Sequence, residues 1–377
     1  MIGIIHMGAA KTGSSTLQEF FHLNRARLRD AGVFYPRSPG AKQHGLLAES
    51  CIDLAREPRR EQVERRNREF RESFAGEMAR DGGGMDHLLV SSELFHARLW
   101  NAAEIERLKA LLQPWCSSWR IVFYMRRQDR YATSLHSTYL RRGGESDAIL
   151  DVLNPHHFDY GGILAMWSGV FGGESMLPRV FERDALAGGD IVADFVESSG
   201  LPLALDGCER PADRNAALSA DAQWFLREFN RRRPRSVDAM ADGEARLRRG
   251  IADFLSAHRA GKPAMPDRAA ARAFLAGYRE ANAEVARRWF GREMLFDESF
   301  DDYPEAASTT MPSTSEAMDA AVPLLRHLAA NSVWLDEDRR QRLANAKTTP
   351  ALLAALAGYL GECDPALAQR IRDIGEA

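Results

Sequence analysis

Residues 1–24 read MIGIIHMGAAKTGSSTLQEFFHLN, and they pass from an apolar run through a turn of small residues into an amphipathic stretch. The apolar run 2–7 has the length and composition of a strand that is buried on both faces of a sheet. Beyond the turn, Leu17, Phe20 and Phe21 fall on one face of a helix. The stretch therefore predicts a strand, a short turn and a helix.

The turn has the composition of an anion-binding site. Gly8, Gly13 and their small neighbours leave backbone N–H groups able to point at an anion, and the dipole of the following helix adds attraction. Lys11 adds a full positive charge. The start of the helix supplies hydroxyl groups, from Ser14, Ser15 and Thr16. The alternative interpretation is a tight connection between strand and helix, capped by a serine.

The position of the lysine separates this turn from the common nucleotide-binding loop. The pattern G-x-x-x-x-G-K-[ST] places its lysine directly after the second glycine and its hydroxyl on Mg²⁺. Here Lys11 stands two positions before Gly13, and no Gly-Lys-Ser occurs in the chain. This departure argues against ATP or GTP as a phosphoryl donor. It leaves open a nucleotide whose 5′ group is bound without Mg²⁺.

Composition places the chain among ordinary globular proteins. Of its 377 residues, 45% are hydrophobic, and 50 basic side chains nearly balance 53 acidic ones, so no overall field favours nucleic acid or a membrane surface. The four cysteines are far apart and form no zinc-binding pattern, which is typical of reduced thiols. No run of about 18 apolar residues predicts a membrane span. We expect a soluble, cytoplasmic protein.

Apolar runs alternate with helical patterns over the first half of the chain. Strands are expected at residues 2–7, 87–91, 120–125 and 176–181. Strands that alternate with helices predict an open α/β fold with helices on both faces of a mostly parallel sheet. From about residue 184 the pattern becomes mostly helical. The predicted organisation is an α/β domain with helical insertions over 1–300, a Ser/Thr/Pro-rich linker over 301–319 and a small helical appendage over 320–377.

Two further strand ends carry polar residues, and ligands of open α/β sheets bind at such ends. Glu93 follows the second predicted strand in HLLVSSELF and is a candidate general base; a helix N-cap by a neighbouring serine or a structural ion pair is the alternative. The third strand runs into RRQDRYATS, where Arg126 precedes Ser134 by eight positions. A guanidinium and a hydroxyl are suited to bind a second phosphate through hydrogen bonds. The alternative is that Arg126 and Arg127 form ion pairs with acidic neighbours.

Taken together, these strand ends resemble the PAPS-dependent sulfotransferases, and the likeness covers about residues 1–300. The resemblance implies a P-loop-like three-layer α/β fold with a helical C-terminal region. Residues 11–16 resemble the loop for the 5′-phosphosulfate, which assigns donor binding to Lys11, Thr12, Gly13, Ser14, Ser15 and Thr16. RRQDRYATS resembles the element for the 3′-phosphate, which assigns Arg126 and Ser134. The family's basic run near the C-terminus has no clear equivalent.

The implied reaction moves a sulfuryl group from PAPS to a hydroxyl or amine, with no metal. Lys11 and the turn stabilise the leaving group. Glu93, or alternatively His44 in GAKQHGLLAES, takes the proton of the acceptor. Bacterial members with similar downstream sequence act on saccharides, so a glycan or other small acceptor is expected, with no nucleic acid and no membrane span. The alternatives are a nucleotide-dependent kinase and a non-catalytic nucleotide-binding protein.

Overall fold

The chain forms two compact units in the computed structural model, which describes residues 1–9, 11–57, 59–151, 154–212, 217–232, 250–257, 261–307 and 341. The first unit comprises Met1–Leu135, Val152–Arg214 and Ala269–Asp302, and the second comprises His136–Asp151, Asn215–Arg268 and Tyr303–Ala377. The predicted boundaries of the linker and the appendage stay predictions, because residues 308–340 and 342–377 lie outside the described part of the chain.

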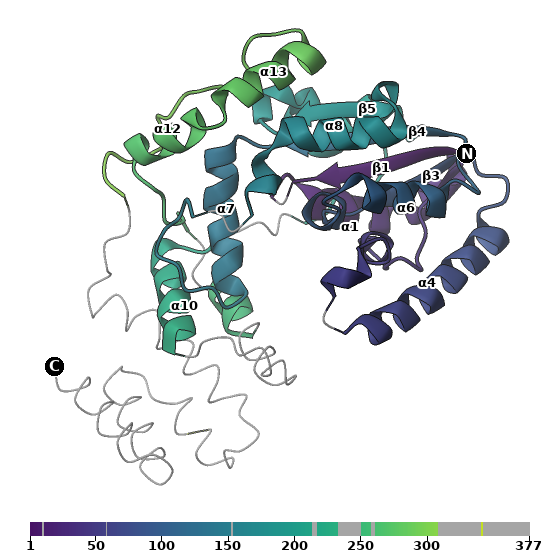
Figure 1. The fold of residues 1–377 in the computed structure, drawn as a ribbon, viewed down its shortest axis with the longest axis horizontal. Coiled ribbons are helices and arrows are strands. Elements are labelled where there is room, and N and C mark those ends of the chain that lie inside the picture. The colour runs from purple at the N-terminus through teal and green to yellow at the C-terminus, as the bar shows by residue number, and fades with distance from the viewer. Residues whose placement is uncertain are drawn as a thin grey trace. The chain divides into compact units, whose positions relative to one another are not determined.

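A five-stranded parallel sheet lies at the centre of the first unit (Figure 1). The strands are β1 (Ile2–Gly8), β2 (Val33–Phe34), β3 (His87–Ser91), β4 (Ser118–Met125) and β5 (Met176–Val180). Their spatial order is β2-β3-β1-β4-β5, so β1 is the middle strand, with Ile5 opposite Val90 on one side and Ile121 on the other. The four predicted strands are confirmed. The fifth, β2, was not predicted, because two residues show no periodicity.

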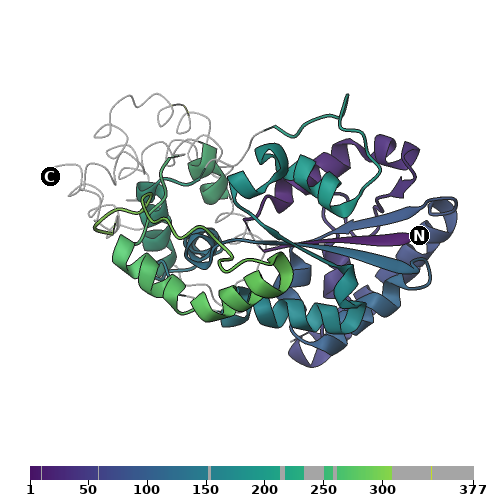
Figure 2. The same ribbon diagram turned by 90° about the horizontal axis from the view of Figure 1, so that it is seen from above.

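Helices cover both faces of this sheet, as the nearly edge-on view in Figure 2 shows, so the fold is a three-layer α/β fold. Ile4, Leu89 and Val122 point to one face, and Ile5, Val90 and Ile121 to the other, because side chains alternate along a strand. The first face packs against α1 (Ser14–Leu23), α2 (Arg25–Asp30) and α9 (Ile191–Ser199). The second packs against α3 (Gly45–Glu49), α4 (Arg60–Asp81), α5 (Leu94–Arg98), α6 (Ala102–Leu112), α8 (Tyr160–Phe171) and α13 (Arg279–Phe290).

The second unit has a small apolar core of its own. Helix α7 (Gln128–Arg141) begins in the first unit and ends in the second, where Leu140 joins Leu226 of α10 (Ala220–Arg232) and Leu255. The Asn230 amide donates to the carbonyl oxygens of Leu140 and Gly144 at 2.8 and 2.7 Å, which holds α10 against the end of α7.

The remaining elements are short. Helix α12 (Arg268–Ala276) ends just before α13, and five 3₁₀ turns lie at Leu54–Arg56, Pro155–Phe158, Gly173–Ser175, Arg183–Ala185 and Ala187–Gly189. Within the ranges that the structure describes, no helix is both long and apolar enough to cross a membrane.

The connections that follow β1 and its neighbouring strand leave toward opposite faces of the sheet, and this positions the turn after β1. From β1 the chain enters α1 on one face of the sheet, whereas the neighbouring strand β3 leads into α5 and α6 on the opposite face. Connections that leave in opposite directions open a crevice at the carboxyl ends of the strands. The turn after β1 therefore lies where ligands of open α/β sheets bind.

Candidate functional site

The turn between β1 and α1 has a strained backbone. Lys11 adopts φ 67° and Gly13 adopts φ 75°, both in the left-handed region. Gly13 takes this conformation without penalty, whereas for Lys11 it costs roughly 1 kcal/mol or more. Such strain is concentrated at ligand-binding loops, where the surrounding structure enforces it.

Two polar side chains of the turn point inward, beneath the backbone. Thr12 is fully buried, and its Oγ1 donates to the Ala9 carbonyl oxygen at 2.6 Å. The Ser14 side chain is also buried. A Cβ atom on Gly8 would lie only 2.4 Å from Ser14 Oγ and 2.8 Å from Thr12 Oγ1, so the glycine is required for this close approach.

The other side chains of the turn face outward. Lys11, in the turn, and Ser15, in the first turn of α1, are exposed, and Thr16 is half-buried. Five of the six residues assigned to donor binding thus fall into an outer set, Lys11, Ser15 and Thr16, and an inner set, Thr12 and Ser14. The sixth, Gly13, provides the left-handed backbone of the turn.

Arg126 joins the carboxyl end of β4 to this turn. Its Nη1 donates to the carbonyl oxygen of Lys11 at 2.9 Å, although 115 residues separate the two. Tyr160 fixes the backbone of Arg126, because its hydroxyl donates to the Arg126 carbonyl at 2.5 Å and accepts from the Arg126 N–H at 3.4 Å. The structure therefore brings together the two cationic residues that the sequence singled out. Ser134 lies farther along α7, half-buried.

Arg127, the next residue, has a structural role. It is fully buried and makes a bidentate ion pair with Asp129, with both N–O distances 2.8 Å. Its Nη1 also donates to the carbonyl oxygens of Asp297 and Ser299, at 2.6 Å each. The alternative interpretation, pairing with an acidic neighbour, is thus confirmed for Arg127.

Glu93 follows β3 directly and precedes α5. It is half-buried, and no group among the described residues pairs with its carboxylate. The Ser92 hydroxyl accepts a hydrogen bond from the Leu94 N–H at 3.1 Å and so stabilises the turn that presents Glu93. A carboxylate at the carboxyl end of the strand beside β1 is placed to accept a proton from a substrate in the crevice.

His44 is fully buried, and both of its ring nitrogens bind the backbone. Nδ1 accepts from the Ser91 N–H at 3.2 Å, and Nε2 donates to the Pro36 carbonyl oxygen at 3.0 Å. Burial lowers the pKa of His44 to about 3, which keeps the ring neutral. These contacts attach the loop 36–44 to the end of β3. Of the two candidate bases, the geometry therefore favours Glu93.

His6 is a site residue that the sequence interpretation missed. It lies in β1 two residues before Gly8, fully buried, with Nδ1 2.8 Å from Ser91 Oγ. Burial lowers its pKa to about 3. The available signal was a single polar residue in an otherwise apolar strand, on the same side as Ile4 and Gly8.

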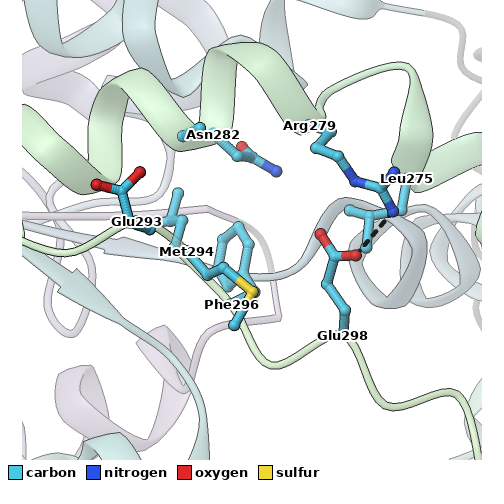
Figure 3. A pocket seen from close by; sticks show the side chains of 9 residues that line it. Leu275, Arg279, Asn282, Glu293, Met294, Phe296 and Glu298 are labelled. Atoms are coloured by element: carbon cyan, nitrogen blue, oxygen red, sulfur yellow. Dashed lines mark hydrogen bonds and ion pairs between the residues drawn. The ribbon is translucent and has the colours of Figure 1, made fainter.

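A pocket lies between α13 and the segment 293–298 (Figure 3). It has a volume of about 250 Å³ and apolar walls that include Leu275, Met294 and Phe296, with the Arg279–Glu298 ion pair of 2.8 Å beside it. None of the residues assigned from the sequence lines this pocket. Within the described ranges, no group of three or more His, Cys, Asp or Glu side chains is arranged to hold a metal ion.

Comparison with known proteins identifies no family for this chain. No family model matches it, and no solved structure matches it. An uncharacterised protein of Archaeoglobus fulgidus is 23% identical over 216 residues. The match covers 55% of this chain, and the chain spans 55% of the length of that relative.

Proposed function

We propose that the protein is a PAPS-dependent sulfotransferase of P-loop-like fold. The turn after β1 binds the 5′-phosphosulfate, and Arg126 with Ser134 binds the 3′-phosphate. The observation that carries the proposal is the hydrogen bond from Arg126 to the carbonyl oxygen of Lys11. This bond brings a guanidinium from the end of β4 beside the turn after β1. Its position supports a donor that carries anionic groups on both its 5′ and 3′ positions.

The cationic groups supply the electrostatic part of the reaction. As the bond between sulfur and the bridging oxygen breaks, negative charge grows on the 5′-phosphate of the leaving adenosine 3′,5′-bisphosphate. Lys11 and the outward N–H groups of the turn stabilise this charge, because preorganised donors are strongest where charge develops. Lys11 lies in this turn with its side chain exposed.

Glu93 supplies the proton transfer. A new S–O bond forms to the acceptor hydroxyl while the bond to the bridging oxygen breaks, and the acceptor proton passes to the Glu93 carboxylate. The carboxylate has no partner among the described residues that would have to be displaced first. The acceptor is proposed to be a saccharide, or an amine or hydroxyl compound of similar size, and this part rests on the sequence resemblance.

Calorimetry tests the donor site. Adenosine 3′,5′-bisphosphate should bind with micromolar affinity or better in the presence of EDTA. Binding of ATP that needs Mg²⁺, with no binding of the bisphosphate, would refute the proposal and favour a kinase. Incubation with ³⁵S-labelled PAPS and a panel of glycans then tests turnover. Bisphosphate binding without transfer to any acceptor, and without slow hydrolysis of PAPS, would indicate a non-catalytic nucleotide-binding protein.

A further inference from the structure

His6 lies beneath the anion-binding turn, on the face of the sheet that α1 covers. The rings of Tyr124 and Phe195 pack edge-on against it, with centroid distances of 5.9 and 5.5 Å. The imidazole is therefore held in one orientation by aromatic walls, with one ring nitrogen toward Ser91 and the other toward Gly8. A polar group in such surroundings is destabilising unless it has partners for its hydrogen bonds.

The neutral ring of His6 carries one proton, on either Nδ1 or Nε2. Its Nδ1 lies 2.8 Å from Ser91 Oγ, a hydroxyl that can accept a proton or donate one. This contact fixes the ring and leaves Nε2 to pair with a second group, as a donor or as an acceptor.

His6 Nε2 lies close to the glycine that precedes the turn. A Cβ atom on Gly8 would lie 3.4 Å from His6 Nε2 and 2.4 Å from Ser14 Oγ, so both atoms border the same space beneath the glycine. Both are buried, and neither has a hydrogen-bond partner among the described residues. A hydroxyl can donate or accept, so Ser14 can pair with Nε2 in either tautomer of the ring. Leaving either of them unpaired costs free energy.

We propose that His6 is a positioning residue of the turn after β1, whose Nε2 pairs with the Ser14 hydroxyl and so holds the turn in its binding conformation when an anion binds. Ser91 anchors the ring through Nδ1, so residues that do not touch the ligand determine its affinity. The inference rests on the proposed function only for the identity of the ligand. His6 itself does not contact the donor.

Two substitutions at His6 separate the roles of its ring nitrogens. His6→Asn places an amide group near Nδ1 and preserves only the contact with Ser91. His6→Gln places an amide group near Nε2 and preserves a partner for the Ser14 hydroxyl. For adenosine 3′,5′-bisphosphate measured by calorimetry, we expect His6→Asn and Ser14→Ala each to weaken binding about tenfold. We expect His6→Gln to stay within about threefold of the wild type, and the double variant His6→Asn/Ser14→Ala to be no weaker than either single variant. Additive losses in the double variant, or wild-type binding by His6→Asn, would overturn the inference.

NMR of the ligand-free protein supplies a readout that needs no ligand. With ¹⁵N-labelled histidine, the His6 signals are assigned by their loss in His6→Gln and should show one neutral tautomer. Ser14→Ala should move the Nε2 resonance, and Ser91→Ala should move the Nδ1 resonance. An Nε2 resonance that Ser14→Ala leaves unchanged contradicts the inference even if His6→Asn fails to fold. If the Ser14 effect appears but no bisphosphate binds, the proposed function fails and the role of His6 stands.

Discussion

Arg126 and Arg127 are neighbours in the chain, and we predict opposite consequences for their removal. The Arg127 guanidinium is fully buried and binds the Asp129 carboxylate through two contacts of 2.8 Å. Arg127→Met leaves that carboxylate buried without its cation, which typically costs about 3–5 kcal/mol. The carbonyl oxygens of Asp297 and Ser299 lose donors at 2.6 Å in addition. We expect the free energy of unfolding to fall by about 4 kcal/mol or more, a large part of the roughly 5–15 kcal/mol that holds a domain.

Arg126→Ala should leave the fold nearly intact and damage the site. The contact of Arg126 with the Lys11 carbonyl lies at the surface, where such bonds contribute about 1 kcal/mol or less to stability. A charge-assisted bond to a phosphate is worth about 1.5–3 kcal/mol, so bisphosphate affinity should fall by about 10- to 100-fold. Urea unfolding followed by circular dichroism measures the first effect, and calorimetry measures the second.

A double variant serves as the matched control. Arg127→Met/Asp129→Leu removes both charges, so no uncompensated buried carboxylate remains, and it should be more stable than Arg127→Met alone. The assignment of roles is refuted if Arg127→Met unfolds at the urea concentration of the wild type but no longer binds the bisphosphate, while Arg126→Ala unfolds early and binds normally.

Three further predictions concern the turn and the buried histidines. Gly8→Ala should lower the free energy of unfolding, measured in urea, by about 1–3 kcal/mol, because the new Cβ would lie 2.4 Å from Ser14 Oγ. As the control, Gly169→Ala in α8 adds a Cβ with nothing within 4 Å and should raise the free energy of unfolding by up to about 1 kcal/mol. Lys11→Ala should lower kcat for sulfuryl transfer by the equivalent of about 2–4 kcal/mol, and turnover near that of the wild type would contradict its role. His44 and His96 have pKa values lowered by burial from 6.5 to about 3, so the unfolded chain binds their protons first. Each should remove about 1.4 kcal/mol of stability per pH unit as the pH falls from about 6.5 toward 3. His96→Gln should therefore reduce the slope of unfolding free energy against pH by one proton, and an unchanged slope would show that His96 is not buried and neutral.

Local patterns were sufficient to predict much of the fold. The strands β1, β3, β4 and β5 show as apolar runs, and the turn after β1 shows as glycines and hydroxyl residues between a strand and a helix. These signals are readable because side-chain periodicity and turn chemistry depend on residues within a few positions of one another. The three strand ends that carry polar residues were found for the same reason.

Contacts between residues far apart in the sequence could not be predicted from such local patterns. The sequence near Arg126 and Arg127 does not indicate which of the two side chains faces the turn. Arg127 is buried because it donates to the carbonyl oxygens of Asp297 and Ser299, which lie 170 and 172 residues farther along the chain. His44 lies in a stretch that has the sequence of a surface loop, yet its ring nitrogens bind the backbone of Pro36, eight residues away, and of Ser91, 47 residues away. The role of His6 depends on Ser91, which pairing of β1 with β3 brings beside it. Local sequence thus determined which elements form and where the glycine-containing turn after β1 lies. Strand pairing and burial decided which side chains reach that turn, because a hydrogen bond between residues far apart in the chain exists only after the sheet has brought them together.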